Sequence, residues 1–162
     1  MLKQERWVDT TDHYKLYVRT WGNEQLPAMV LVHGYPDNQE VWEKMIPSLI
    51  QHFYVVTYDV RGAGRSSVPK KIVSYRLPQL ANDLESVVNR VIANRPFHLA
   101  AHDWGSIQTW EAVTEPRFKG RILSYSTISG PCLDHAANLL RKVVKAEPLQ
   151  LVKLLGKSWY IG

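Results

Sequence analysis

Cysteine is nearly absent from the sequence: Cys132 is the only one among 162 residues. A single cysteine excludes an internal disulfide bond and any zinc site built from cysteines. Long hydrophobic runs are absent too, because the longest, residues 28–32, is far shorter than the roughly 18 residues of a membrane span. The first residues contain no apolar segment typical of a secretory signal. We therefore expect a cytoplasmic protein without a membrane span.

Strong compositional bias is also missing. Hydrophobic residues make up 45% of the sequence and charged residues 22%, which is typical of one ordinary globular domain. The net charge of +5 raises the possibility of nucleic-acid binding. Much of the positive charge lies on late amphipathic segments without a nucleic-acid-binding motif, at Arg141, Lys142, Lys145, Lys153 and Lys157. We interpret these residues as a solvated face and expect no nucleic-acid partner.

Short apolar runs alternate with segments of helical periodicity. An opening antiparallel hairpin is predicted at residues 7–9 and 14–19, and buried strands at 29–32, 53–58, 97–101 and 121–128. Helices are expected at residues 41–49, at 80–91 with Pro78 in the first turn, and at 104–113. This alternation predicts an α/β fold with right-handed crossovers and a mainly parallel sheet of about six strands.

The pattern of the sequence changes after Gly130 and Pro131. Residues 133–162 have helical character throughout, with no further β pattern. A parallel sheet that stops here leaves its last strand as an uncovered edge, which proteins usually avoid. We therefore expect a fold truncated after its sixth strand.

The loop after the third buried strand carries the most informative motif. Asp103 lies between the small residues Ala101 and Gly105, at a predicted junction of strand and helix. This spacing is typical of a nucleophile elbow with Asp in place of the more common Ser. Asp at such a junction can instead simply cap the helix. The residues leave both interpretations open.

Two other loops follow buried strands and are expected at the same edge of the sheet. The backbone N–H groups of Tyr35 and Trp104 are candidates for an oxyanion hole, although Gly34-Tyr35-Pro36 can also be a simple turn. The glycine pair Gly62 and Gly64 lacks the third glycine of a dinucleotide-binding fingerprint. We interpret that loop as structural support.

The motifs occur together in one order: His33-Gly34-Tyr35-Pro36, the run from Asp59 to Ser66, His102-Asp103-Trp104-Gly105, and Ser158-Trp159-Tyr160. In this combination the chain resembles the α/β-hydrolase family, and within it the epoxide hydrolases. Residues 129–135 are also similar to bacterial relatives in which such a domain precedes a short-chain dehydrogenase domain. The resemblance implies the α/β-hydrolase fold, with residues 1–131 as the first part of its core and 132–162 as the beginning of a helical cap.

The resemblance also implies a two-step mechanism. Asp103 attacks a small apolar epoxide while Tyr160 hydrogen-bonds the ring oxygen, and water then hydrolyses the ester, whose oxyanion Tyr35 and Trp104 stabilise. No metal ion and no organic cofactor is expected. Supporting roles are implied for His33, Gly34, Pro36, Asp59, Arg61, Gly62, Gly64, His102 and Gly105.

The family's catalytic histidine follows the last strand of the complete fold, and no histidine here occupies that place. The six histidines are His13, His33, His52, His98, His102 and His135. Asp134 follows the last predicted strand, where some dehalogenases carry their acid, but its spacing is poor. We expect an incomplete site, with self-association or completion by a missing C-terminal half.

Two alternatives remain at this stage. A haloalkane dehalogenase uses the same Asp and Trp, but it usually has an Asn-like halide donor where this chain has Tyr35, and it does not need Tyr160. Fluoroacetate-type enzymes resemble His-Asp-Arg, whereas Trp104 stands here. The alternative outside the enzymes is a non-catalytic fragment of a hydrolase and short-chain dehydrogenase fusion.

Overall fold

The computed structural model of the chain describes residues 3–146, with the side chains of 143–146 left aside. It divides the chain into two compact units, Met1–Gly130 and Pro131–Gly162. The strands are β1 (Lys3–Asp9), β2 (Lys15–Trp21), β3 (Ala28–Val32), β4 (Tyr54–Tyr58), β5 (Phe97–His102) and β6 (Ile122–Ile128). The α-helices are α1 (Ile46–Leu49), α2 (Leu77–Ile92), α3 (Trp104–Thr114) and α4 (Leu133–Ala146). Short 3₁₀ helices are η1 (Gln39–Trp42), η2 (Ile72–Tyr75) and η3 (Pro116–Phe118).

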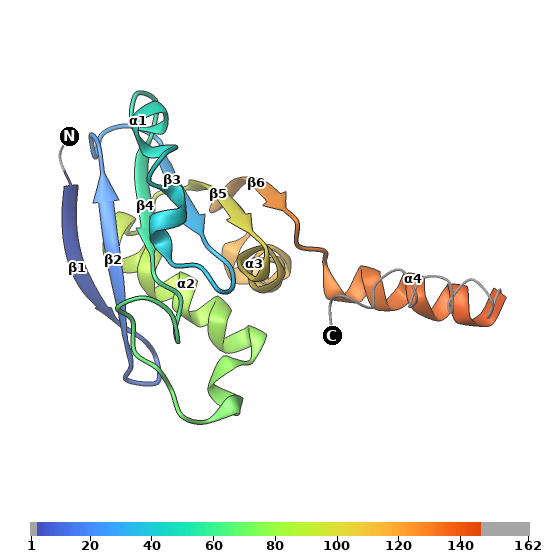
Figure 1. The fold of residues 1–162 in the computed structure, drawn as a ribbon. Helices are drawn as coiled ribbons and strands as arrows, with labels where there is room; N and C mark the ends of the chain where they lie inside the picture. Colours follow the sequence, from blue (N-terminus) through green and yellow to red (C-terminus); the bar gives the residue numbers. More distant parts are fainter. Residues whose placement is uncertain (1–2, 147–162) are drawn as a thin grey trace. The chain divides into compact units, whose positions relative to one another are not determined.

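The strands of the first unit form one six-stranded sheet in the order β1-β2-β4-β3-β5-β6 (Figure 1). β1 pairs antiparallel with β2, and β2 pairs antiparallel with β4. β3 pairs parallel with both β4 and β5, and β5 pairs parallel with β6. The predicted mixed, mainly parallel sheet with an antiparallel N-terminal hairpin is confirmed. Because β3, β4 and β5 are parallel neighbours, the loops that follow them meet at one edge of the sheet.

The two faces of the sheet bury alternate residues of each central strand, as the period of a β-strand requires. One face packs against α2 and α3 through Ala28, Val30, Val32, Tyr54, Val56, Tyr58, Phe97, Leu99 and Ala101. The other face carries Leu31 and Val55, which pack against Trp42 of η1 and Ile46 of α1. β4 lies between β2 and β3 and has all five residues buried. The core therefore holds β3, β4 and β5 firmly beneath the candidate site.

Helix α2 forms where its apolar stripe predicts. Pro78 lies in its first turn, where its missing N–H costs nothing. Leu84, Val87 and Val88 are buried against the sheet. The helix ends at Ile92, and the positive φ of Ala93 turns the chain toward β5.

Three local expectations were wrong. Residues 41–49 form two short helical turns, η1 and α1, rather than one helix, and the side chains of Val41 and Met45 are exposed. β6 lies at the edge of the described sheet, as expected, but its residues are mostly exposed rather than buried. β1 begins at Lys3, because backbone pairing with β2 extends the hairpin beyond its apolar residues.

The second unit is described as far as α4. Its helical conformation agrees with the periodicity after Pro131, whereas Tyr160 and its neighbours lie outside the described residues. None of the described helices is both long and apolar enough to cross a membrane.

A buried ion pair links the loop after β4 to helix α2. The Arg61 side chain is fully buried and forms two hydrogen bonds with Asp83, from Nε to Oδ2 at 2.6 Å and from Nη2 to Oδ1 at 2.5 Å. Arg61 also contacts Asp12 at 2.9 Å, and this hydrogen bond lowers the pKa of Asp12 to about 2. Burial opposes the charge of Arg61, but its hydrogen bonds with Asp83 and Asp12 keep its pKa raised. The guanidinium is therefore charged, and its role is to link the loop after β4 to helix α2.

Replacing Asp83 with Asn should lower the free energy of unfolding by about 3–5 kcal/mol, because it leaves a buried guanidinium short of its counter-charge. Glu85→Gln on the same helix is the matched control. Glu85 pairs with Arg117 at the surface, and the loss there should stay below about 1 kcal/mol. Urea denaturation of both variants measures the difference, and equal losses would contradict the structural role of the pair.

Candidate active site

Asp103 lies in the sharp turn between β5 and α3. Its backbone has φ 54° and ψ −127°, a left-handed conformation that non-glycine residues rarely adopt. Its side chain makes no capping hydrogen bond to α3. Oδ1 accepts a hydrogen bond of 3.0 Å from the backbone N–H of Tyr35 instead. The helix-cap alternative is therefore wrong, and the carboxylate faces the loop after β3.

Two glycines make room for this turn. A Cβ atom at Gly105 would collide with the backbone carbonyls of Val32 and His33, so only glycine lets α3 approach β3 so closely. A Cβ atom at Gly34 would collide with the side chain of Asp103. Both glycines are therefore needed for the close approach that brings the two loops together.

Ser106 fixes the turn from the other side, and no sequence motif indicated this role. Its Oγ donates to the carbonyl oxygen of Ala101 at 2.6 Å and accepts a hydrogen bond of 3.2 Å from Ile128 N–H. The backbone N–H of Asp103 donates to the Ile128 carbonyl oxygen at 2.8 Å. A buried hydroxyl thus connects β5, α3 and β6 directly behind Asp103.

The two predicted oxyanion donors are the backbone N–H groups of Tyr35, in the loop after β3, and of Trp104, directly after Asp103 in the chain. The Tyr35 N–H already holds Oδ1. The Trp104 N–H is at the first position of α3 and makes no hydrogen bond to any described residue, as expected for the free donors of a helix N-terminus. The side chains of both residues are exposed, Tyr35 by 76% and Trp104 by 55%. Each of the two residues thus combines a backbone N–H donor with an exposed aromatic side chain.

His33 fixes the loop that carries Tyr35. The ring is fully buried, with Nδ1 2.8 Å from the Gly34 carbonyl oxygen and Nε2 accepting a 2.9 Å hydrogen bond from Val60 N–H. Burial lowers the pKa of His33. A neutral ring with its proton on Nδ1 satisfies both contacts, so His33 connects the loops after β3 and β4. Pro36 follows Tyr35 through a cis peptide bond.

Asp59 organises the loop after β4. Its carboxylate accepts hydrogen bonds from the backbone N–H groups of Gln39, at 3.0 Å, and Arg65, at 2.8 Å. Gly64 has φ 51°, and a Cβ atom there would collide with the Asp59 carboxylate. Gly62 also has a positive φ, of 84°. The loop is held by its own carboxylate and by the Arg61 ion pair.

No histidine hydrogen-bonds to Asp103 in residues 3–146. His98 Nδ1 lies 2.7 Å from Ser124 Oγ across β5 and β6. His102 Nδ1 is buried and has no hydrogen-bond partner among the described residues. Asp134 and His135 lie on α4, in the second unit. In the described part of the first unit, the Asp103 carboxylate therefore has the Tyr35 N–H as a donor and no histidine as a base.

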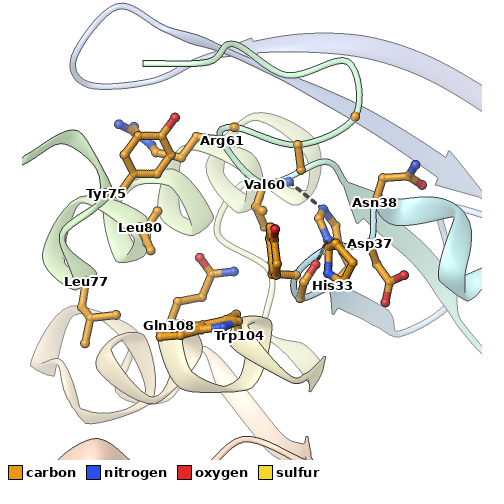
Figure 2. Close-up of a pocket in the computed structure, with 16 residues that line it drawn as sticks. His33, Asp37, Asn38, Val60, Arg61, Tyr75, Leu77, Leu80, Trp104 and Gln108 are labelled. Carbon is orange, nitrogen blue, oxygen red and sulfur yellow. Dashed lines mark hydrogen bonds between the residues drawn. The ribbon is translucent and has the colours of Figure 1, made fainter. Parts of the chain in front are cut away.

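A hollow of about 680 Å³ opens beside these loops (Figure 2). The loops after β3 and β4 contribute His33, Gly34, Tyr35, Pro36, Asp37, Asn38, Val60, Arg61, Gly62, Ala63 and Gly64. The helices contribute Tyr75, Leu77, Leu80, Trp104 and Gln108. Asp103 itself is not in the lining, but both of its candidate N–H donors belong to residues that are. The hollow is therefore the candidate substrate pocket.

Several lining residues were not predicted. Leu77 and Leu80 lie in the first turn of α2, and both line the pocket. Gln108 lies four residues after Trp104 and shares its face of α3, a spacing that sequence reasoning could have used. Among the residues that the structure describes, no group of three or more His, Cys, Asp or Glu is placed to hold a metal ion.

Comparisons with known proteins agree with this geometry. Residues 27–159 match the family described as "alpha/beta hydrolase fold". A Mycobacterium tuberculosis protein named "Probable oxidoreductase EphD" is 40% identical over 84% of this chain and 23% of its own length. "Epoxide hydrolase A" of the same organism is 33% identical over 82% of this chain and 40% of its own. The crystal structure of epoxide hydrolase VrEH1 from Vigna radiata gives a TM-score of 0.72 at 27% identity, covering 80% of this chain and 40% of that one.

The chain thus spans between 23% and 40% of the length of these relatives. The family match includes β3 to β6 and the three loops described above.

The buried His33 predicts a pH dependence of stability. Because its pKa is lowered in the folded state from 6.5, the unfolded chain binds the proton first as the pH falls. The free energy of unfolding should therefore decrease below about pH 6.5, by at most about 1.4 kcal/mol per pH unit for this residue. Urea denaturation between about pH 8 and about pH 5 measures the slope.

His33→Asn should flatten this dependence, whereas His52→Asn, at an exposed position, should leave it unchanged. Titration of the His33 ring by NMR in the unmodified chain gives a second measurement. A His33 pKa at or above 6.5 would contradict the neutral, buried ring.

Proposed function

The chain belongs to the α/β-hydrolase fold family, and from this membership we propose that it carries the nucleophile, the oxyanion donors and part of the substrate pocket of an epoxide hydrolase. One observation carries the proposal. The carboxylate of Asp103 stands in a left-handed strand-to-helix turn, leaves α3 uncapped and is held by the Tyr35 N–H. The names of the relatives support an epoxide as the substrate class.

In the first step, Oδ2 of the ionised Asp103 attacks a carbon of the epoxide ring. The new carbon–oxygen bond forms as the ring C–O bond breaks, and the ring oxygen takes up a proton. Oδ1 stays on the Tyr35 N–H, which leaves Oδ2 as the attacking atom. The family resemblance assigns the proton donor to Tyr160, which lies outside the described residues.

In the second step, water adds to the ester carbonyl and releases the diol, which restores the Asp103 carboxylate. The negative charge develops on Oδ1, where the N–H groups of Tyr35 and Trp104 can stabilise it. Removing one such donor costs about 10²–10³-fold in rate in comparable sites. This step also needs a base to take a proton from water, and the described residues place no histidine on Asp103. The proposal therefore assigns to this chain the formation of the ester and the binding of its oxyanion, but not the base that hydrolysis needs.

The proposal includes two further elements of the family fold, a helical cap and additional strands. The family resemblance assigns residues 132–162 to the beginning of a helical cap domain. The unpaired side of β6 would receive further strands, since the relatives are longer than the matched region.

Incubation with styrene oxide should attach one molecule of the epoxide to Asp103 without sustained formation of diol. Attack needs the carboxylate and a proton donor, the role assigned to Tyr160, whereas release needs a base worth about 10²–10⁴-fold. Peptide mass spectrometry locates the adduct, and chromatography measures the diol.

Asp103→Ala should abolish the adduct, whereas Asp37→Ala, which removes a carboxylate of the pocket lining, should retain it. Equal modification of unmodified chain and Asp103→Ala would contradict the proposed nucleophile. Continued diol formation by the chain alone would contradict the claim that the chain lacks a base for ester hydrolysis. His135 with Asp134 would then be the first candidates.

A further inference from the structure

Gln108 is the one amide that α3 presents to the pocket. Its side chain is only 7% exposed, and its amide makes no hydrogen bond to any described residue. Figure 2 shows this amide between Trp104 and the α2 side chains Leu77 and Leu80. The amide atoms keep some contact with solvent through the pocket, so a polar group of a bound substrate can replace water as their hydrogen-bond partner.

The other polar groups of the lining are accounted for differently. The Arg61 guanidinium is saturated by Asp83, Asp12 and the Ser74 carbonyl oxygen. The Tyr75 hydroxyl donates to the Pro69 carbonyl oxygen at 3.0 Å. Asp37 and Asn38 belong to the loop after β3 and lie on the opposite side of the view from Gln108 (Figure 2). Among the α2 and α3 side chains of the lining, Gln108 is therefore the one that can both donate and accept and has no partner among the described residues.

We infer that Gln108 determines substrate specificity by hydrogen-bonding a neutral hydroxyl or carbonyl group of the substrate, at a distance from the reacting epoxide ring. The inference rests on the proposed function and names its substrate class more narrowly. An amide donates through its NH₂ group and accepts through its oxygen, so it suits a hydroxyl in either sense. No described cation is free in this part of the lining to bind an anionic group.

The position of Gln108 on α3 sets its distance from Asp103 along the helix. Gln108 follows Asp103 by five residues, which is a rise of roughly 7 Å along α3. A substituent at the para position of a styrene oxide spans a similar length from the epoxide carbon. Trp104 lies on the same helical face between the two, so its ring would contact the aromatic body of the substrate.

The test uses two styrene oxides of nearly equal shape, one with a para-hydroxymethyl group and one with a para-ethyl group. The rate of adduct formation on Asp103 is measured for each by mass spectrometry. The unmodified chain should react roughly threefold to tenfold faster with the hydroxymethyl compound, the ratio that one neutral hydrogen bond carries.

Gln108→Leu should remove or reverse this preference, while Gln51→Leu, the same exchange at an exposed position, should keep it. Calorimetric binding of the two corresponding diols, which cannot react, gives a readout independent of the chemistry. The unmodified chain should bind the hydroxymethyl diol more tightly by a similar factor. This comparison needs no variant and holds even if Gln108→Leu fails to fold.

The outcomes separate the two proposals. Equal binding of the diols and equal reaction of the epoxides by the unmodified chain would overturn the role of Gln108, even with Asp103 modified. A preference that persists in a folded Gln108→Leu would overturn it as well. Preferential binding that depends on Gln108, without any adduct on Asp103, would support the role of Gln108 and contradict the proposed nucleophile.

Discussion

The backbone turn at Asp103 is the constraint on which the rest of the site depends. A left-handed conformation at a residue other than glycine costs of order 1–3 kcal/mol and persists only where the surroundings determine it. Here Ser106 holds the turn from behind, and the Asp103 N–H is bonded to β6. Gly105 lets α3 approach β3 closely enough to complete it. The same turn prevents the carboxylate from capping its own helix and directs it to the Tyr35 N–H.

The loops around this turn are held by polar groups that are already fully engaged. His33 joins two loops through one donor and one acceptor nitrogen, and it does so best as a neutral ring. Asp59 holds its own loop through backbone N–H groups, and Arg61 anchors the same loop to α2. Because these groups have their partners within the protein, they keep the geometry fixed. The groups left for a ligand include the Trp104 N–H and the Gln108 amide.

Much of this arrangement follows from the sequence, and the limits have physical causes. The apolar run of β3 and the apolar stripe of α2 predicted a sheet covered by helices, because burial follows the periods of strand and helix. Residues 41–49 carried a helical period yet form two short turns, because exposed Val41 and Met45 contribute little burial. Asp83 could not be assigned to Arg61 in advance, since nothing local indicates a contact across 22 residues. The pocket could not be predicted from the sequence either, because it forms only where α2 and α3 approach the loops.

The central claim is that Asp103 uses one carboxylate oxygen as nucleophile while the other stays in the oxyanion site. A crystal structure of the chain after reaction with styrene oxide tests this most directly. The account predicts electron density that continues from Asp103 Oδ2 into the pocket beside Trp104, with Oδ1 still within hydrogen-bond distance of the Tyr35 N–H. Density that continues from Asp37 instead, or an unmodified Asp103 whose carboxylate has turned to cap α3, would contradict it.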